Sequence, residues 1–156
     1  YFHKQIAFNF IPVIDTINND GTTMEETKIT QEINKILGGT FDLVVTSVRV
    51  ATKVGHGNSL TIKFTNDVSI GAVETVLSNS GQILLSDPYS SVKDAEGQSK
   101  ILVSRLRQHS SNKISLFICS DNLLRGAAYD LMLAFEHVKK MQLITPSKDS
   151  LITSST

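Results

Sequence analysis

The sequence predicts an α+β fold in which a mixed, largely antiparallel sheet is covered by helices on one face. Its apolar segments follow the order β–α–β–β–α–β–β–β–α, with the strands grouped in pairs and joined by short connections. Only some strand pairs have a helix between them, so a regular βαβ winding fits less well. No glycine-rich dinucleotide loop follows a strand. A dinucleotide cofactor would therefore need another domain for most of its site.

The first helix has clear signals at both ends. Thr23 and Glu26 form a capping box at its start. Apolar residues then recur at helical spacing until Gly38 and Gly39 end the helix.

Strands are predicted on both sides of this helix. The segment 6–15 is short and apolar, and Pro12 argues against a helix there. Residues 41–50 are rich in β-branched side chains, and residues 60–66 alternate apolar with polar side chains. Both patterns are typical of strands.

The second half repeats the mixture of strands and helices. A helix is expected over 69–79 and a final helix over 122–141, each with an apolar face. Strands are expected over 82–87, 100–108 and 113–120, followed by a polar, Ser/Thr-rich tail. We therefore predict one domain over 1–141 and a loosely held tail over 142–156.

Composition and charge limit the classes of partner. The 156 residues carry 15 basic and 15 acidic side chains. This balance gives no broad field for nucleic acid or an anionic membrane, so neither is an expected partner. No apolar run approaches the roughly 20 residues that span a bilayer. A single cysteine, and no basic-then-apolar secretory signal, predict a cytoplasmic location. The chain lacks an initiator methionine, as expected of a piece of something longer.

Two polar residues in "SVRVATKVGHGNS" are candidates for catalysis. Arg49 lies at the end of the 41–50 segment, where a guanidinium suits a carboxylate held in a bidentate manner. A structural partner within the protein is the alternative for Arg49. His56 lies between Gly55 and Gly57, and an imidazole suits proton transfer near neutral pH. The alternative for His56 is an ordinary exposed residue in a turn.

A second candidate pair is Glu25 and Lys28 in the first turns of the first helix. Three residues apart, they are neighbours on one helix face. They form either a solvated ion pair or an anion and a cation for a zwitterionic or phosphorylated ligand. Cys119, in an apolar strand, is interpreted as a buried structural residue. The four scattered histidines give no metal-ligand spacing, so no metal site is predicted.

Five ordered stretches resemble the C-terminal half of aspartate-β-semialdehyde dehydrogenases, over about residues 5–138. They are "QIAFNFIPVID", "TTMEETKITQEINKILG", "SVRVATKVGHGNS", "KDAEGQSKILVSRLR" and "SDNLLRGAAYDLMLA". The resemblance implies a C-terminal domain like that of glyceraldehyde-3-phosphate dehydrogenase, which lines the substrate site and dimerises through its sheet face. It also implies an N-terminal Rossmann domain, absent from this chain, that binds NADP and carries the nucleophilic cysteine.

The implied reaction is the reductive dephosphorylation of β-aspartyl phosphate by NADPH, in lysine, threonine and methionine biosynthesis. By resemblance, Arg49 would clamp the substrate α-carboxylate, and His56 would act as general acid and base. Glu25 would bind the substrate amino group, and Lys28 would help to hold the phosphate. Asn122, Leu123 and Arg125 match the segment that approaches the cofactor, where backbone N–H groups would meet it. The isolated chain is expected to fold and to be inactive.

Departures from the family pattern leave one alternative, and a related family of reductases is another. The family's "RVP" and "GHSES" are "RVA" and "GHGNS" here, and Asp130 and Leu133 replace polar residues of the last helix that face the cofactor. One alternative is therefore a non-catalytic relative or a stand-alone dimerisation module. The other is an N-acetylglutamyl-phosphate reductase, whose substrate lacks the free amino group that Glu25 would bind.

Overall fold

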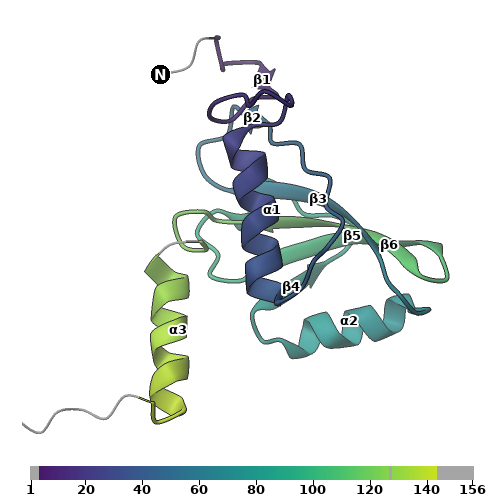
Figure 1. Cartoon of the computed structure of the whole chain (residues 1–156). Helices are drawn as coiled ribbons and strands as arrows, with labels where there is room; N and C mark the ends of the chain where they lie inside the picture. The colour runs from purple at the N-terminus through teal and green to yellow at the C-terminus, as the bar shows by residue number, and fades with distance from the viewer. Residues whose placement is uncertain (1–3, 127, 144–156) are drawn as a thin grey trace, which may run out of the picture. The chain divides into compact units, whose positions relative to one another are not determined.

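A computed structural model describes residues 4–126 and 128–143, and these divide into two compact units, the first ending at Lys53 and the second beginning at Val54. In the first unit, strand β1 (Phe10–Ile11) pairs antiparallel with β2 (Arg49–Val50), and helix α1 spans Met24–Leu37 (Figure 1). The predicted capping box is confirmed at the start of α1, and Gly38 caps its end. The predicted tail begins at 142, and most of it, 144–156, lies outside the described residues.

The strand predicted over 41–50 is wrong except at its end. Only Arg49 and Val50 pair with another strand. Burial still alternates through the segment, with residues 43, 45, 47 and 49 more covered than their neighbours. The side-chain pattern of a strand is thus present without its ladder. A strand needs backbone partners as well as a pattern, and β1 supplies only two residues.

The second unit contains a four-stranded sheet in the order β3-β6-β5-β4. Its strands are β3 (His56–Lys63), β4 (Ile83–Ser86), β5 (Ile101–Ser110) and β6 (Lys113–Ser120). Only β4 and β5 run parallel, which confirms the mixed, largely antiparallel sheet. Strand β3 begins four residues earlier than the segment 60–66 predicted, and His56 is therefore its first residue.

Helix α2 (Ile70–Asn79) packs on one face of this sheet (Figure 1). Ile70, Val73 and Leu77 contact a core built on the fully buried Val103 and Ile114. Val76, another apolar residue of this helix, is 71% exposed. The apolar alternation along β6 accounts for this core, because every second side chain of the strand faces the helix.

The opposite face carries a smaller core near the end of β6 where β3 begins. A short 3₁₀ helix, η1 (Val92–Ala95), lies in the predicted polar loop and packs there. Its Ala95 is fully buried with Leu102 and Cys119, and Val92 and Phe117 pack against them. This cluster fixes η1 against the end of the sheet, beside the start of β3.

The final helix, α3 (Ala128–Lys140), begins six residues later than 122, where the sequence predicted it. Residues 121–126 form a separate turn instead, in which the Asp121 carbonyl accepts the N–H groups of Leu124 and Arg125. Gly126 then adopts a left-handed φ of +87°, which a continuous helix does not permit. Two of its apolar residues, Leu131 and Phe135, are 73% and 57% exposed.

Replacing Ile114 by alanine tests the assigned core. Ile114 is fully buried beneath α2, so Ile114→Ala should lower the free energy of unfolding by about 2–5 kcal/mol. Ile62, its cross-strand partner on β3, is 37% exposed and provides a matched control with a smaller loss. Urea denaturation of the chain measures both. Equal losses would contradict the placement of the core.

Candidate functional site

Glu25 and Lys28 meet on the exposed side of α1, as their spacing predicted. The Lys28 ammonium lies 3.9 Å from a Glu25 carboxylate oxygen, and the two side chains are 60% and 33% exposed. An exposed ion pair at this distance contributes little to stability. Both groups therefore remain available to a ligand at small cost.

Glu26, between these two residues, is buried and joins α1 to the segment that leads to Arg49. One carboxylate oxygen accepts the Thr23 N–H at 2.7 Å, completing the capping box, and the other accepts the Ser47 N–H at 2.8 Å. These two bonds hold the pKa of Glu26 below its usual value, and the bond from Ser47 has the larger effect. The capping box gave the first contact from sequence. The second spans 21 residues and has no local signal.

Arg49 lies two residues beyond Ser47, half-buried in β2 and opposite Ile11. Glu26 therefore fixes the first turn of α1 and the approach to Arg49 with a single side chain. The three predicted substrate residues, Glu25, Lys28 and Arg49, all belong to the first compact unit. His56 belongs to the second.

His56 is exposed at the start of β3, opposite Ser120 of β6. The preceding Gly55 has φ +99°, a region that favours glycine. A Cβ at Gly55 would lie only 2.5 Å from Val92 Cγ1 and 3.0 Å from the Ser120 carbonyl oxygen. The glycine-framed turn expected from sequence is therefore a tight contact of backbone against η1 and β6.

Asn122 supplies a further contact to this turn. Its side-chain Oδ1 accepts the Gly55 N–H at 2.6 Å. The neighbouring Asp121 is buried, and its carboxylate accepts the N–H groups of Gly97 and Leu123, both at 2.8 Å. These bonds lower the pKa of Asp121, and the bond from Gly97 has the largest effect. Asn122 thus projects from an anchored turn toward the residue before His56.

The backbone donors predicted to meet the cofactor are engaged within the protein. The N–H of Leu123 donates to the Asp121 carboxylate, and that of Arg125 donates to the Asp121 carbonyl. The Leu123 side chain is 65% exposed. This turn therefore presents an apolar side chain to its surroundings, and two of its N–H groups are already used.

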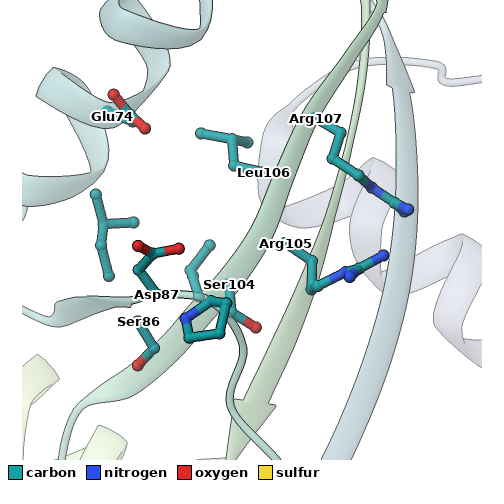
Figure 2. Close-up of a pocket in the computed structure, with 10 residues that line it drawn as sticks. Glu74, Ser86, Asp87, Ser104, Arg105, Leu106 and Arg107 are labelled. Atoms are coloured by element: carbon teal, nitrogen blue, oxygen red, sulfur yellow. The ribbon is translucent and has the colours of Figure 1, made fainter.

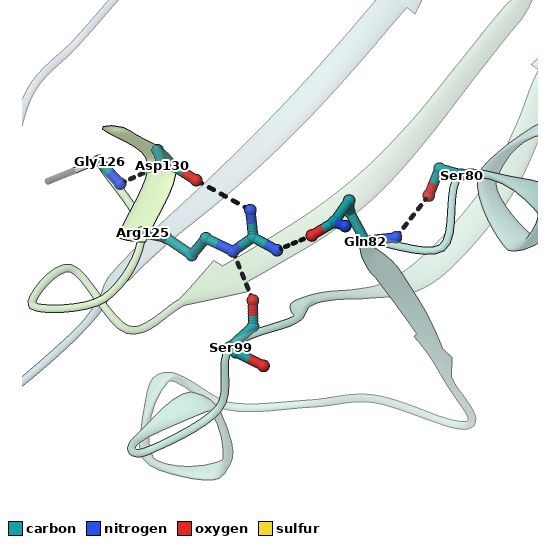
Figure 3. A network of polar contacts seen from close by, with 6 residues as sticks. All are labelled: Ser80, Gln82, Ser99, Arg125, Gly126 and Asp130. Atoms are coloured by element: carbon teal, nitrogen blue, oxygen red, sulfur yellow. Dashed lines mark hydrogen bonds and ion pairs between the residues drawn. The ribbon is translucent and has the colours of Figure 1, made fainter. Parts of the chain in front are cut away.

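The Arg125 side chain is 8% exposed and lies in a polar network (Figure 3). Its guanidinium donates to the Ser99 carbonyl and the Gln82 side chain, and forms an ion pair with Asp130 at 2.9 Å. The Tyr129 ring centroid lies 5.0 Å from its central carbon. The sequence did not reveal this structural role, because three partners lie 26, 43 and 5 residues away.

Cys119 is fully buried, and burial raises the pKa of its thiol. Its interpretation as a structural residue is confirmed. Among the described residues, no three His, Cys, Asp or Glu side chains gather closely enough to hold a metal ion. The helices in that part of the chain are also too short or too polar to cross a membrane.

A cavity of about 470 Å³ lies at the edge of the sheet, where β4 ends and β5 continues (Figure 2). Arg105 and Arg107 point to one side of β5, and Glu74 and Asp87 lie on the other side. The cavity contains none of the predicted site residues. Its opposed charges do not single out one class of ligand.

The family model described as "Semialdehyde dehydrogenase, dimerisation domain" matches residues 1–125. The aspartate-semialdehyde dehydrogenase of Rickettsia bellii is 40% identical over 149 residues, covering 91% of this chain and 44% of the relative. The chain thus spans less than half the length of this relative.

Solved structures agree with the sequence comparison. Aspartate semialdehyde dehydrogenase II of Vibrio cholerae, complexed with ASA, matches with a TM-score of 0.82 and 32% identity, over 89% of this chain and 43% of that one. The Candida albicans enzyme with NADP matches with a TM-score of 0.68, over 89% of this chain and 46% of that one. At 22% identity, the second likeness supports the fold alone.

Replacing Glu26 by glutamine tests its role as the link to Ser47. The amide keeps one acceptor oxygen and loses the other, so Glu26→Gln should reduce the protection of the Ser47 or Thr23 amide from hydrogen exchange. Because the folded pKa of Glu26 is below its unfolded value of about 4.3, the carboxylate stabilises the fold fully above that pH. This contribution is lost as the pH falls through the folded pKa.

The difference in protection between wild type and Glu26→Gln should therefore be largest near pH 7 and shrink below about pH 4. NMR-detected exchange, corrected for intrinsic rates, measures it. Glu25→Gln, at the neighbouring half-exposed position, should leave the Ser47 amide unchanged. A difference that does not vary with pH would contradict the assignment.

Proposed function

The chain belongs to the family of semialdehyde dehydrogenase dimerisation domains, and from this premise we propose that it is the substrate-site and dimer-forming part of an NADP-dependent aspartate-semialdehyde dehydrogenase. The whole protein would reductively dephosphorylate β-aspartyl phosphate to aspartate β-semialdehyde. The observation that carries this proposal is the joint presence of Glu25, Lys28, Arg49 and His56, in order, in a chain whose relatives have that name.

The first unit offers one group for each charge of the substrate. An aspartyl phosphate carries an α-carboxylate, an ammonium and a phosphate. The planar guanidinium of Arg49 suits the carboxylate, the Glu25 anion suits the ammonium, and the Lys28 ammonium suits the phosphate. The weak contact between Glu25 and Lys28 supports these roles, because binding a zwitterion would replace one exposed ion pair with two.

His56 is the proposed proton carrier. A thiol nucleophile must lose its proton to become the thiolate that attacks the acyl phosphate, and a thiohemiacetal oxygen must gain or lose one. The exposed imidazole on a rigid turn can exchange protons with either group. Cys119 is excluded as that nucleophile, because it is buried and its thiol has a raised pKa. The nucleophile would come from the part of the protein that this chain does not include.

The cofactor would be held mainly by that other part as well. The N–H groups of Leu123 and Arg125, expected to meet it, already donate to Asp121. NADPH would supply the hydride in the proposed reaction. The proposal includes a homodimer formed through the sheet face, a cytoplasmic location, and a place in lysine, threonine and methionine biosynthesis. Strand β3, exposed along its whole length, supports the dimer.

Two substitutions in the full-length protein separate the proposed roles. Arg49→Ala should raise the KM for aspartate semialdehyde about 10- to 100-fold, because a charged hydrogen bond to the substrate is lost. His56→Ala should lower kcat about 10²- to 10⁴-fold, because proton transfer is lost. Phosphate-dependent reduction of NADP measures both, with Lys53→Ala, an exposed cation between them, as the control. Wild-type kinetics in both variants would refute the assignment.

The same assay tests the reductase alternative. Aspartate semialdehyde should be a substrate, and the N-acetylated glutamate semialdehyde should not, because it has no ammonium for Glu25 to bind. Glu25→Gln should weaken use of the first substrate. The isolated chain is expected to give no turnover, and turnover by the pure chain would contradict its proposed place in a larger enzyme.

A further inference from the structure

We propose that Asn122 is a positioning residue, which holds the turn before His56 so that the imidazole keeps its place. This inference rests on the proposed role of His56. It gives Asn122 a different role from the cofactor contact that the sequence predicted. Three features of the second unit support this role.

The first feature is the end of the strand ladder. His56 pairs with Ser120, and this is the last pair between β3 and β6. The Gly55 N–H lies one residue beyond the ladder, where no strand partner continues. Asn122 Oδ1 accepts this N–H at 2.6 Å. The Asn122 side chain therefore extends the hydrogen bonding of the strand by one bond, directly before His56.

The second feature is that Asn122 is itself anchored. It follows the buried Asp121, whose carboxylate accepts the N–H groups of Gly97 and Leu123. The carbonyl of Asp121 accepts two more N–H groups, from Leu124 and Arg125. A hydrogen bond can fix the position of a donor only if the acceptor is itself held in place. Here the acceptor projects from a turn closed by four bonds.

The third feature is the absence of steric freedom at Gly55 together with the exposure of His56. Gly55 is wedged against Val92 and Ser120, whereas the His56 side chain is exposed. The backbone on the N-terminal side of His56 is therefore fixed by packing and by Asn122, while its ring faces outward. Proton transfer needs the ring within hydrogen-bond reach of the reacting group, and an error of about 1 Å can cost on the order of 10²-fold in rate.

The test compares Asn122→Leu with Asn122→Asp in the full-length protein. Leucine removes the acceptor, so kcat should fall by up to about 100-fold with the KM values for aspartate semialdehyde and NADP unchanged. Aspartate keeps an acceptor oxygen at the same position and should restore most of kcat. NMR should show faster hydrogen exchange of the Gly55 amide in Asn122→Leu than in Asn122→Asp.

Asn112→Leu is a matched control. The Asn112 side chain also bonds a backbone group next to β3, donating to the Phe64 carbonyl at 3.0 Å, but at the other end of the strand. Its replacement should lower stability and leave kcat unchanged. If Asn122→Leu does not fold, Asn122→Ala against Asn122→Asp gives the same comparison.

Several results would overturn the inference. The first is a wild-type kcat in Asn122→Leu. The second is a raised KM for NADP with unchanged kcat in that variant, which would indicate a cofactor contact. The third is a loss of kcat in Asn122→Asp equal to that in Asn122→Leu. The His56→Ala variant separates this failure from that of the proposed function. If His56→Ala is inactive and Asn122→Leu is normal, only the positioning role fails. If His56→Ala is normal, the proposed function fails.

Discussion

The close approach of backbone at Gly55 is the constraint on which the second unit's part of the site depends. No side chain fits there, because η1 lies 2.5 Å from the position that a Cβ would occupy. The end of β6, η1 and the 121–126 turn all meet at this point. Each is held by its own contacts, through Cys119 and Ala95 in the small core and through Asp121 in the turn. Together these three segments fix the position of the backbone just before His56.

Two buried carboxylates organise the site segments without being candidates for the chemistry. Glu26 and Asp121 each accept two backbone N–H groups, one close in sequence and one more than 20 residues away. A buried charge is costly unless it is hydrogen-bonded, and here each carboxylate also satisfies amides that would otherwise lack a partner. The site segments are thus held by buried groups. The more exposed polar side chains of Glu25, Lys28 and His56 remain available to a ligand.

The sequence predicted those features whose causes are local. The capping box at Thr23 and the strand β6 are examples, because spacing within a few residues determines both. The strand over 41–50 was predicted wrongly, since its pattern says nothing of whether a partner strand lies alongside. The start of the final helix was predicted at 122, six residues too early, since no local pattern shows that residues 121–126 form a separate turn.

The contacts that position the candidate site were invisible for the same reason. Glu26 reaches Ser47 across 21 residues, and Asn122 reaches Gly55 across 67. Neither pair leaves a periodic signal. The residue types were nevertheless informative: a second glutamate beside the first in α1, and an asparagine at the start of a turn, are side chains that bind backbone amides.

A double-mutant cycle between Asn122 and His56 tests the central claim most directly, that the turn is built to place His56. The kcat of the full-length protein is measured for wild type, Asn122→Leu, His56→Ala and the double variant. If Asn122 acts through His56, its replacement lowers kcat only when His56 is present, and the double variant equals His56→Ala. Independent, multiplying losses would contradict the account.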